Sequence, residues 1–276
     1  MLPLFISEDV WQRALRLELP FNSCGVDPFG ISRPHIARAM SLLEFLYRRY
    51  FSVRVHGIQN VPARGAGMLV GNHSGGVAID GAMVIASCFF ELEPPRLAQG
   101  MVEKFINRWP FASQWTNRTG QFTGLPEHAT QLLTSGRLLM TFPEGARGTA
   151  KLYNERYSLV SFGTGFMRLA LAAKAPIVPF GFLGGGEAVP TIFNSQFLGS
   201  LVGAPYVPIT PYLVAFPLPV ELDIYYGEPM IFEGSGNEAD EVIAGYVEQV
   251  RTRIAELLQA GLDARKEGLK VGGINR

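Results

Sequence analysis

Short apolar stretches alternate with amphipathic ones along most of this chain, and this pattern limits the fold more than any other feature. The apolar stretches at residues 68–70, 138–142 and 176–182 have the length and composition of buried strands. Helical spacing of apolar residues lies between them, as at residues 79–91 and 162–174. Buried strands joined by helices are typical of parallel sheets. We therefore expect an α/β fold with a mostly parallel central sheet flanked by helices.

The beginning of the chain differs from this core. Residues 1–33 are interrupted by Pro, Gly and Asn residues and predict an irregular lead. From Pro34 to about Tyr50 apolar residues recur at helical spacing, and arginines flank the stripe that they form. Such an amphipathic helix could lie on an anionic membrane or simply cover the sheet. We divide the chain into a lead with this helix, residues 1–50, and a domain of residues 51–276.

The rest of the chain supplies further elements of the same kinds. Gly268 is expected to end the last helix, because glycine often follows a helix C-terminus. The predicted strands are residues 51–56, a short stretch near Leu97, residues 120–123 and 220–226; the predicted helices are residues 102–115, 126–135 and about 237–267.

Residues 189–219 have a character of their own. They hold many Pro, Phe, Leu and Val residues and few charges. A loop of this length inside a compact domain is uncommon and is often functional. The segment could wall a pocket for an acyl chain, touch lipid, or cover the core as an ordinary loop.

Composition narrows the range of partners. The 24 basic and 24 acidic residues balance, so nothing favours nucleic-acid binding. Hydrophobic residues make up 47% and charged residues 17%, which fits an apolar substrate, a membrane surface or a densely packed core. Two cysteines provide neither a disulfide framework nor a metal site and favour a reducing compartment. Because no apolar run is long enough to span a bilayer, we expect a peripheral protein at the cytoplasmic face of a membrane.

One histidine stands out as a candidate for chemistry. His73 follows the predicted strand 68–70, and open α/β sheets bind their ligands at such strand ends. An imidazole can take a proton from an alcohol when a second group fixes its tautomer, and Asp80 can be that group. Seven helical positions would separate the two side chains by about 10 Å. His73 must therefore lie in a loop that Gly75 and Gly76 fold back over the helix start.

A second polar segment follows another predicted strand. The segment Phe142-Pro143-Glu144-Gly145-Ala146-Arg147-Gly148 is a Pro/Gly turn that carries Glu144 and Arg147. An arginine at this position can bind a phosphate or another oxyanion, or can form an ordinary ion pair with the glutamate. No protein nucleophile stands out beside the two segments. The combination suits an enzyme that activates a hydroxyl group of its substrate.

These segments resemble the PlsC-like glycerolipid and lysophospholipid acyltransferases. Asn72-His73 with Asp80 resembles their first block, and Phe142–Arg147 another. Residues 103–124, from Glu103-Lys104 to Gly120-Gln121-Phe122-Thr123-Gly124, occupy the place of their second block, and residues 175–180 look like their fourth. The resemblance covers roughly residues 50–230 and agrees in the order and spacing of all four blocks.

The resemblance implies a function. His73 would be the general base on the acceptor hydroxyl, with Asp80 as its partner. The hydroxyl would attack the thioester of acyl-CoA or acyl-carrier protein, with no acyl-enzyme and no bound cofactor or metal. The acceptor would be a lysophospholipid or another glycerolipid at a membrane surface, and residues 51–276 would form the acyltransferase domain. The residues implied to position the acceptor are Asn72, Glu144, Gly145 and Arg147.

Two departures from the family pattern leave the acceptor open. The family usually has four residues between His and Asp, whereas this chain has six. The longer gap with its glycine pair resembles a branch related to mono- and diacylglycerol acyltransferases. The second block commonly ends in an arginine that binds the acceptor phosphate, and here Gly124 stands in its place, with Arg118 nearby but out of register. A neutral glyceride or another long-chain alcohol is therefore an alternative acceptor.

Two alternatives belong to other classes. The longer gap and the missing arginine would also fit a non-catalytic lipid-binding protein on the same fold. A hydrolase could use the same His–Asp pair, although the chain lacks the G-x-S-x-G turn that a serine nucleophile ordinarily needs.

Overall fold

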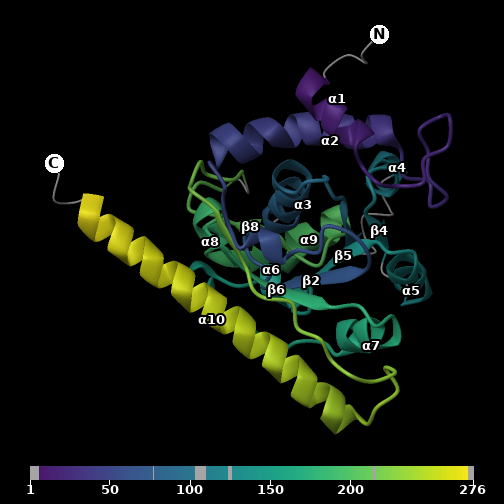
Figure 1. Ribbon diagram of the computed structural model, residues 1–276. Helices are drawn as coiled ribbons and strands as arrows, with labels where there is room; N and C mark the ends of the chain where they lie inside the picture. Colours follow the sequence, from purple (N-terminus) through teal and green to yellow (C-terminus); the bar gives the residue numbers. More distant parts are fainter. Residues whose placement is uncertain (1–5, 77, 103–109, 124–125, 214–215, 273–276) are drawn as a thin grey trace.

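A seven-stranded sheet forms the centre of the computed structural model (Figure 1), which describes residues 6–76, 78–102, 110–123, 126–213 and 216–272. The strand order is β1-β9-β6-β2-β5-β3-β4. A separate hairpin pairs β7 with β8. The strands are β1 (Arg54–His56), β2 (Gly67–Gly71), β3 (Ala98–Val102), β4 (Phe122–Thr123), β5 (Leu138–Thr141), β6 (Ile177–Leu183), β7 (Phe193–Ser195), β8 (Val207–Ile209) and β9 (Asp223–Tyr226).

Helices cover both faces of the sheet, as Figure 1 shows. On one face α1, α2 and α3 share a hydrophobic core with alternate residues of β2, β5 and β6. On the other face α5, α7 and α10 pack against the intervening residues. The helices are α1 (Glu8–Leu15), α2 (Arg33–Phe45) with a π-helical end (Leu46–Tyr50), α3 (Ile79–Glu91), α4 (Pro110–Arg118), α5 (Pro126–Thr134), α6 (Ala146–Thr149), α7 (Gly165–Ala172), α8 (Gly185–Ala188), α9 (Gln196–Val202) and α10 (Asp240–Gly272), with short 3-10 turns at Ile58–Asn60 and Tyr153–Glu155.

The expected mostly parallel sheet is confirmed. Strand β2 pairs in parallel with β5 on one side and with β6 on the other. The exceptions lie at one edge of the sheet: β9 runs antiparallel to β6, and β1 pairs in parallel with β9, so both run opposite to the other strands. The chain enters β9 at the same end of the sheet at which it leaves β6, so β9 runs in the opposite direction to β6.

The lead predicted for residues 1–33 is wrong in one part, because residues 8–15 form α1. The hydroxyl of Ser7 caps this helix by accepting the N–H of Val10, and Glu8 and Asp9 lie in its first turn. The helix predicted after Pro34 is confirmed as α2 with its π-helical end. Its apolar stripe packs on the core, as the buried residues Ile36, Met40 and Tyr47 show. The proposed domain division at residue 50 stays a prediction.

Other predicted elements differ from the structure at their ends. Gly268 does not end the last helix, since α10 continues to Gly272. A Cβ atom at Gly268 would meet nothing within 4 Å, so no packing constraint forces a turn there. The strand predicted for residues 51–56 is limited to β1. The helix predicted for residues 102–115 lies partly outside the described residues, and α4 is its visible part.

Residues 189–219 form neither a bare loop nor one long element. They contain the hairpin of β7 and β8 with α9 between the two strands. None of the helices that the structure describes is long and apolar enough to cross a membrane.

A buried carboxylate stabilises the edge of the sheet formed by β1 and β9. Asp223 is 1% exposed, and its oxygens accept Nε of Arg54 at 2.7 Å and Nε of Arg265 at 2.6 Å. Burial alone would raise the pKa of Asp223, but the hydrogen bonds from Arg54 and Arg265 outweigh it and lower the pKa. A lowered pKa in the folded state contributes stability above the pKa of the unfolded chain, and this stability is lost as the pH falls.

Replacing Asp223 should therefore weaken the fold in a pH-dependent way. We expect Asp223→Asn to lower the free energy of unfolding at pH 7 by about 1.5–3 kcal/mol, the usual contribution of hydrogen bonds to a charged group. The difference from wild type should shrink below about pH 4, where aspartate in the unfolded chain takes up a proton. Urea denaturation between pH 3 and pH 7 measures this. Glu267→Gln on the exposed side of α10 is the control and should leave stability unchanged; an equal loss in both variants would contradict the role of Asp223.

Candidate active site

The candidate site lies where three adjacent parallel strands end. Strand β2 leads into the loop with His73, its neighbour β5 leads into the turn with Glu144 and Arg147, and β6 on the other side leads into Gly184 and Gly185. Register pairs Val70 with Thr141, so the first two loops leave the sheet at the same level. The sheet thus brings together the two polar segments that sequence reasoning singled out.

The imidazole of His73 is bonded to Asp80. Nδ1 lies 2.7 Å from Oδ2 of Asp80, whose side chain is fully buried. The same carboxylate accepts the backbone N–H of Ser74 at 2.8 Å and that of Gly81 at 2.7 Å. Because an ionised carboxylate only accepts hydrogen bonds, a neutral imidazole bonded to it carries its proton on Nδ1 and its lone pair on Nε2. The pair therefore has the arrangement of a general base with an orienting acid.

Two glycines let the loop span six residues between the pair. Gly75 has φ 89° and Gly76 has φ 64°, values that L-residues with side chains rarely adopt. A Cβ atom at Gly75 would lie 2.8 Å from the carbonyl oxygen of Gly185, and one at Gly185 would lie 2.3 Å from Oγ of Ser74. The loop after β2 and the loop after β6 therefore touch backbone to backbone. This contact folds His73 back over the start of α3, as predicted from the spacing of His73 and Asp80.

The ring of His73 is also held on its flat face. It stacks on Phe142, with 4.2 Å between the ring centroids and 13° between the planes. The side chain of His73 is 15% exposed, so part of it is accessible from solvent. Gly148 packs behind it, and a Cβ atom there would lie 2.6 Å from Cβ of His73.

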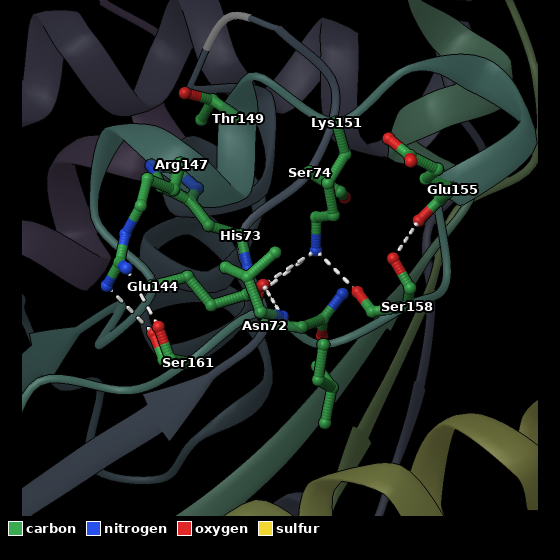
Figure 2. A network of polar contacts seen from close by, with 12 residues as sticks. Asn72, His73, Ser74, Glu144, Arg147, Thr149, Lys151, Glu155, Ser158 and Ser161 are labelled. Carbon is green, nitrogen blue, oxygen red and sulfur yellow. Dashed lines mark hydrogen bonds and ion pairs between the residues drawn. The ribbon is translucent and has the colours of Figure 1, made fainter.

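Glu144 supports the His73 loop from within the protein. It is 1% exposed, and one oxygen accepts the backbone N–H of His73 at 2.9 Å. The other accepts the N–H of Val160 at 3.0 Å, while Nζ of Lys151 binds both oxygens at 2.9 and 3.1 Å. Lys151 also donates to the carbonyl of Ser158, as Figure 2 shows. Glu144 was predicted to position the acceptor, but its oxygens are already occupied by these groups.

Asn72 is likewise engaged with the protein. It is fully buried, its Nδ2 donates to the carbonyl of Phe182 at 3.0 Å, and its Oδ1 accepts the N–H of Phe182 at 2.7 Å. The side chain thus extends the pairing of β2 with β6 by one step. This geometry fits a support for the loop better than the substrate contact that the sequence predicted.

Arg147 projects from the turn after β5. Gly145 precedes α6 with φ 56° and ψ −151°, a conformation available essentially to glycine alone. The exposed guanidinium of Arg147 donates to Oγ of Ser161 at 2.8 Å and to its carbonyl at 3.0 Å (Figure 2). Ser161 is the only hydrogen-bond partner of Arg147 among the described residues. The remaining donors of the fork are therefore available to an oxyanion.

Among the described residues near His73, none offers an accessible side chain that could act as a nucleophile. Ser74 is 3% exposed, and its hydroxyl faces Gly185. Cys88 is fully buried in α3, and burial raises the pKa of its thiol to about 11. No group of three or more His, Cys, Asp or Glu side chains in the described part of the chain could hold a metal ion.

Sequence reasoning missed the supporting residues more than the reactive ones. The sequence patterns assign no role to Lys151, Gly148 or Gly185. The run Gly184-Gly185-Gly186 after a buried strand was a usable signal, because such a run permits close backbone approach. In the second block Glu103, Lys104 and Gly124 lie outside the described residues.

Comparison with known proteins identifies the family. Residues 52–183 match a family model described as Acyltransferase. An uncharacterized protein of Mycobacterium tuberculosis is 33% identical over 253 residues, which cover 87% of this chain and 70% of that protein. The chain belongs to the acyltransferase family. This acyltransferase is therefore an enzyme that moves an acyl group, and the family resemblance found in the sequence is confirmed.

Two further likenesses are informative. A human protein called "DGAT1/2-independent enzyme synthesizing storage lipids" is 27% identical over 180 residues, which cover 65% of this chain and 54% of that protein. The crystal structure of the 1-acyl-sn-glycerophosphate acyltransferase PlsC from Thermotoga maritima superposes with a TM-score of 0.54 at 18% identity and covers 83% of both chains. The second likeness shows that the fold is shared.

Gly148 provides a test of the packing behind His73. Because a methyl group there would meet Cβ of both His73 and Glu144 at under 3 Å, Gly148→Ala should displace the imidazole. We expect acyl transfer to fall by about 10–100-fold, the usual effect of misplacing a catalytic group by about 1 Å. Turnover and Tm of the purified variant measure this.

Gly245→Ala is the matched control. Gly245 lies inside α10, and its Cβ atom would meet nothing within 4 Å. It should keep full activity and gain slightly in stability, because alanine favours the helix. Equal activity of the two alanine variants would show that the Gly148 contact does not position His73.

Proposed function

We propose that this acyltransferase moves a fatty acyl group from an acyl thioester to the hydroxyl of a glycerolipid, with His73 as general base. The observation that carries the proposal is the 2.7 Å bond from Nδ1 of His73 to the buried Asp80. This bond leaves Nε2 as the basic nitrogen of the neutral ring. Such a base needs no protein nucleophile, because the acceptor hydroxyl supplies one.

The reaction requires two proton transfers, both through His73. Nε2 of His73 takes the proton of the acceptor hydroxyl as the oxygen attacks the thioester carbonyl. A C–O ester bond forms and the C–S bond breaks when the tetrahedral intermediate collapses. The imidazolium then returns its proton to the leaving thiolate of coenzyme A or of acyl-carrier protein. Asp80 stabilises the imidazolium during these steps.

The remaining site residues divide into support and recognition. Asn72 and Glu144 act on the substrate through His73, because their polar atoms bind the protein. Gly145 sets the turn that projects Arg147, and Arg147 is the group that would contact an acceptor phosphate. The sequence predicted all four as substrate-binding residues; we propose that direct recognition falls to Arg147.

Two classes of acceptor are supported by the relatives. The Thermotoga maritima protein is named for a phosphate-bearing acceptor, and the human relative is named for storage-lipid synthesis. A lysophospholipid would use the free donors of Arg147, whereas a neutral glyceride would leave them in water. Both acceptors are lipids with a free hydroxyl, so both fit the same base.

Removal of the base is the first test of this function. We expect His73→Ala to lower transfer from acyl-CoA to a mixed pool of lysophospholipids and glycerides by at least about 10³-fold, as for other catalytic bases. Mass spectrometry of the lipid products measures this. His56→Ala is the control, since His56 stacks on Tyr225 outside the site and should keep its activity. Full activity of His73→Ala would remove the assigned base.

Arg147 separates the two classes of acceptor. If the acceptor carries a phosphate, Arg147→Ala should raise its KM by about 10-fold or more through the loss of a charge-assisted contact. The KM of a neutral monoacylglycerol should hardly change. Steady-state kinetics with both acceptors measure the ratio, and Arg253→Ala on α10 provides the control. An equal effect on both acceptors would show that Arg147 acts only on the turn.

A further inference from the structure

The stretch between Glu187 and Glu221 contains no charged residue, in a chain that is 17% charged. We call the described residues of this stretch, 189–213 and 216–220, the uncharged segment. Among the residues that the structure describes, more than half of the exposed large hydrophobic side chains lie in it, with exposed fractions up to 78%. They are Ile192, Phe193, Phe197, Leu198, Leu201, Tyr212, Leu213, Phe216 and Leu218. Exposed apolar surface on this scale marks a site of contact with another molecule or a membrane.

The exposure does not come from a loose loop. Strands β7 and β8 pair with each other, and the side chain of Ser195 caps α9 by accepting the N–H of Leu198. Thr191 and Thr210 are buried at 1% and 0%. The segment is thus an ordered unit with its own buried side, and its apolar side chains point outward from it.

Four contacts brace the uncharged segment on the candidate active site. The hydroxyls of Tyr206 and Thr149 are hydrogen-bonded, and Nδ2 of Asn194 donates to the carbonyl of Ala150 at 2.6 Å. The N–H of Tyr153 donates to the carbonyl of Thr191 at 2.8 Å. A Cβ atom at Gly76 would lie 3.1 Å from Pro208.

Each of these contacts joins the segment to a loop of the site. Thr149 and Ala150 follow Arg147 in the turn after β5, and Gly76 belongs to the loop of His73. A molecule or membrane that binds the uncharged segment is therefore held beside the loops that carry His73 and Arg147.

The far end of the segment meets the π-helical end of α2. The hydroxyl of Tyr50 donates to the carbonyl of Pro217 at 2.7 Å, and its ring packs against Phe216. In Figure 1 this part of the segment lies beside that end of α2.

The exposed side of α2 combines apolar and basic residues. Leu42 and Phe45 are 67% and 59% exposed, and Arg38 and Arg49 lie four residues to either side of the pair. On a helix these four positions fall on one face. Apolar side chains flanked by arginines suit a surface with an apolar interior and anionic headgroups.

We infer that the uncharged segment, together with the exposed face of α2, is the surface on which this enzyme sits on a lipid leaflet. The inference rests on the proposed function, because it assigns the source of the acceptor to that leaflet. Nine apolar side chains without a charge match a lipid interior, and the arginines of α2 match its headgroups. The bracing contacts place the leaflet next to His73, so an acceptor need not leave it fully to react.

Vesicle binding tests the surface without any substrate. We expect the wild-type protein to co-sediment with vesicles of phosphatidylcholine and phosphatidylglycerol. The double variant Phe197→Glu/Leu201→Glu should bind at least about tenfold more weakly, because two apolar side chains no longer insert. Ile231→Glu is the matched control, since Ile231 is 82% exposed outside the segment and should bind as wild type.

The arginines test the contribution of the headgroups. Arg38→Ala and Arg49→Ala should each weaken binding to anionic vesicles roughly fivefold and leave binding to pure phosphatidylcholine unchanged. Equal binding of Phe197→Glu/Leu201→Glu and Ile231→Glu would overturn the inference. A wild-type protein that ignores vesicles but forms a dimer lost in the double variant would overturn it in favour of a second copy of the chain.

Two activity assays separate this inference from the proposed function. With a short-chain acceptor dissolved in water, Phe197→Glu/Leu201→Glu should turn over as fast as wild type. With an acceptor embedded in vesicles it should lose at least about tenfold, in step with binding. Loss in both assays would show that the segment acts on the site itself and not as a docking surface. If wild type lacks turnover in both, the proposed function fails while the vesicle result still stands.

Discussion

The buried carboxylate of Glu144 is the interaction on which the candidate site depends. It receives the N–H of His73 from the loop after β2 and the N–H of Val160 from the segment beyond the turn after β5. The ammonium of Lys151 balances its charge inside the protein. Breaking such a buried pair leaves an uncompensated charge, which costs several kcal/mol. Separating the two loops would break the hydrogen bond from the N–H of His73 to this charged carboxylate, which contributes about 1.5–3 kcal/mol, so Glu144 keeps the loops at a fixed spacing.

His73 is thus fixed at three points by groups of different kinds. Glu144 holds its backbone, Asp80 holds its ring nitrogen, and Phe142 covers one flat face of its ring. Its other ring nitrogen, Nε2, has no hydrogen-bond partner among the residues that the structure describes. An imidazole held this way loses little orientation entropy when a substrate arrives, which is the advantage of building a base on the ends of rigid strands.

The sequence predicted most of the fold because its periodic stretches are long and unambiguous, as for α3 at Ile79–Glu91. It missed α1 because Pro, Gly and Asn surround this short helix, although Ser7 before Glu8 and Asp9 was a capping signal. The antiparallel direction of β9 could not be predicted. The alternation of strands and helices does not show at which end of the sheet the chain re-enters after the long segment that follows β6. His73, Asp80 and Arg147 were found because reactive groups are distinctive in sequence. The partners of Glu144 and Asn72 depend on strand register, which sequence alone does not supply.

Helix α10 has a use that follows from its place in the fold. Its 33 residues give an axis of about 50 Å, and Figure 1 shows its C-terminal part extending past the body of the enzyme. It packs on the face of the sheet opposite α2, through residues such as Ile254 and Leu258. A fluorescent label on the exposed side of this helix near Gly268 would therefore be held at a fixed position relative to the body of the enzyme. Energy transfer from that label to dyes in a bilayer would measure the distance between this end of α10 and the bilayer.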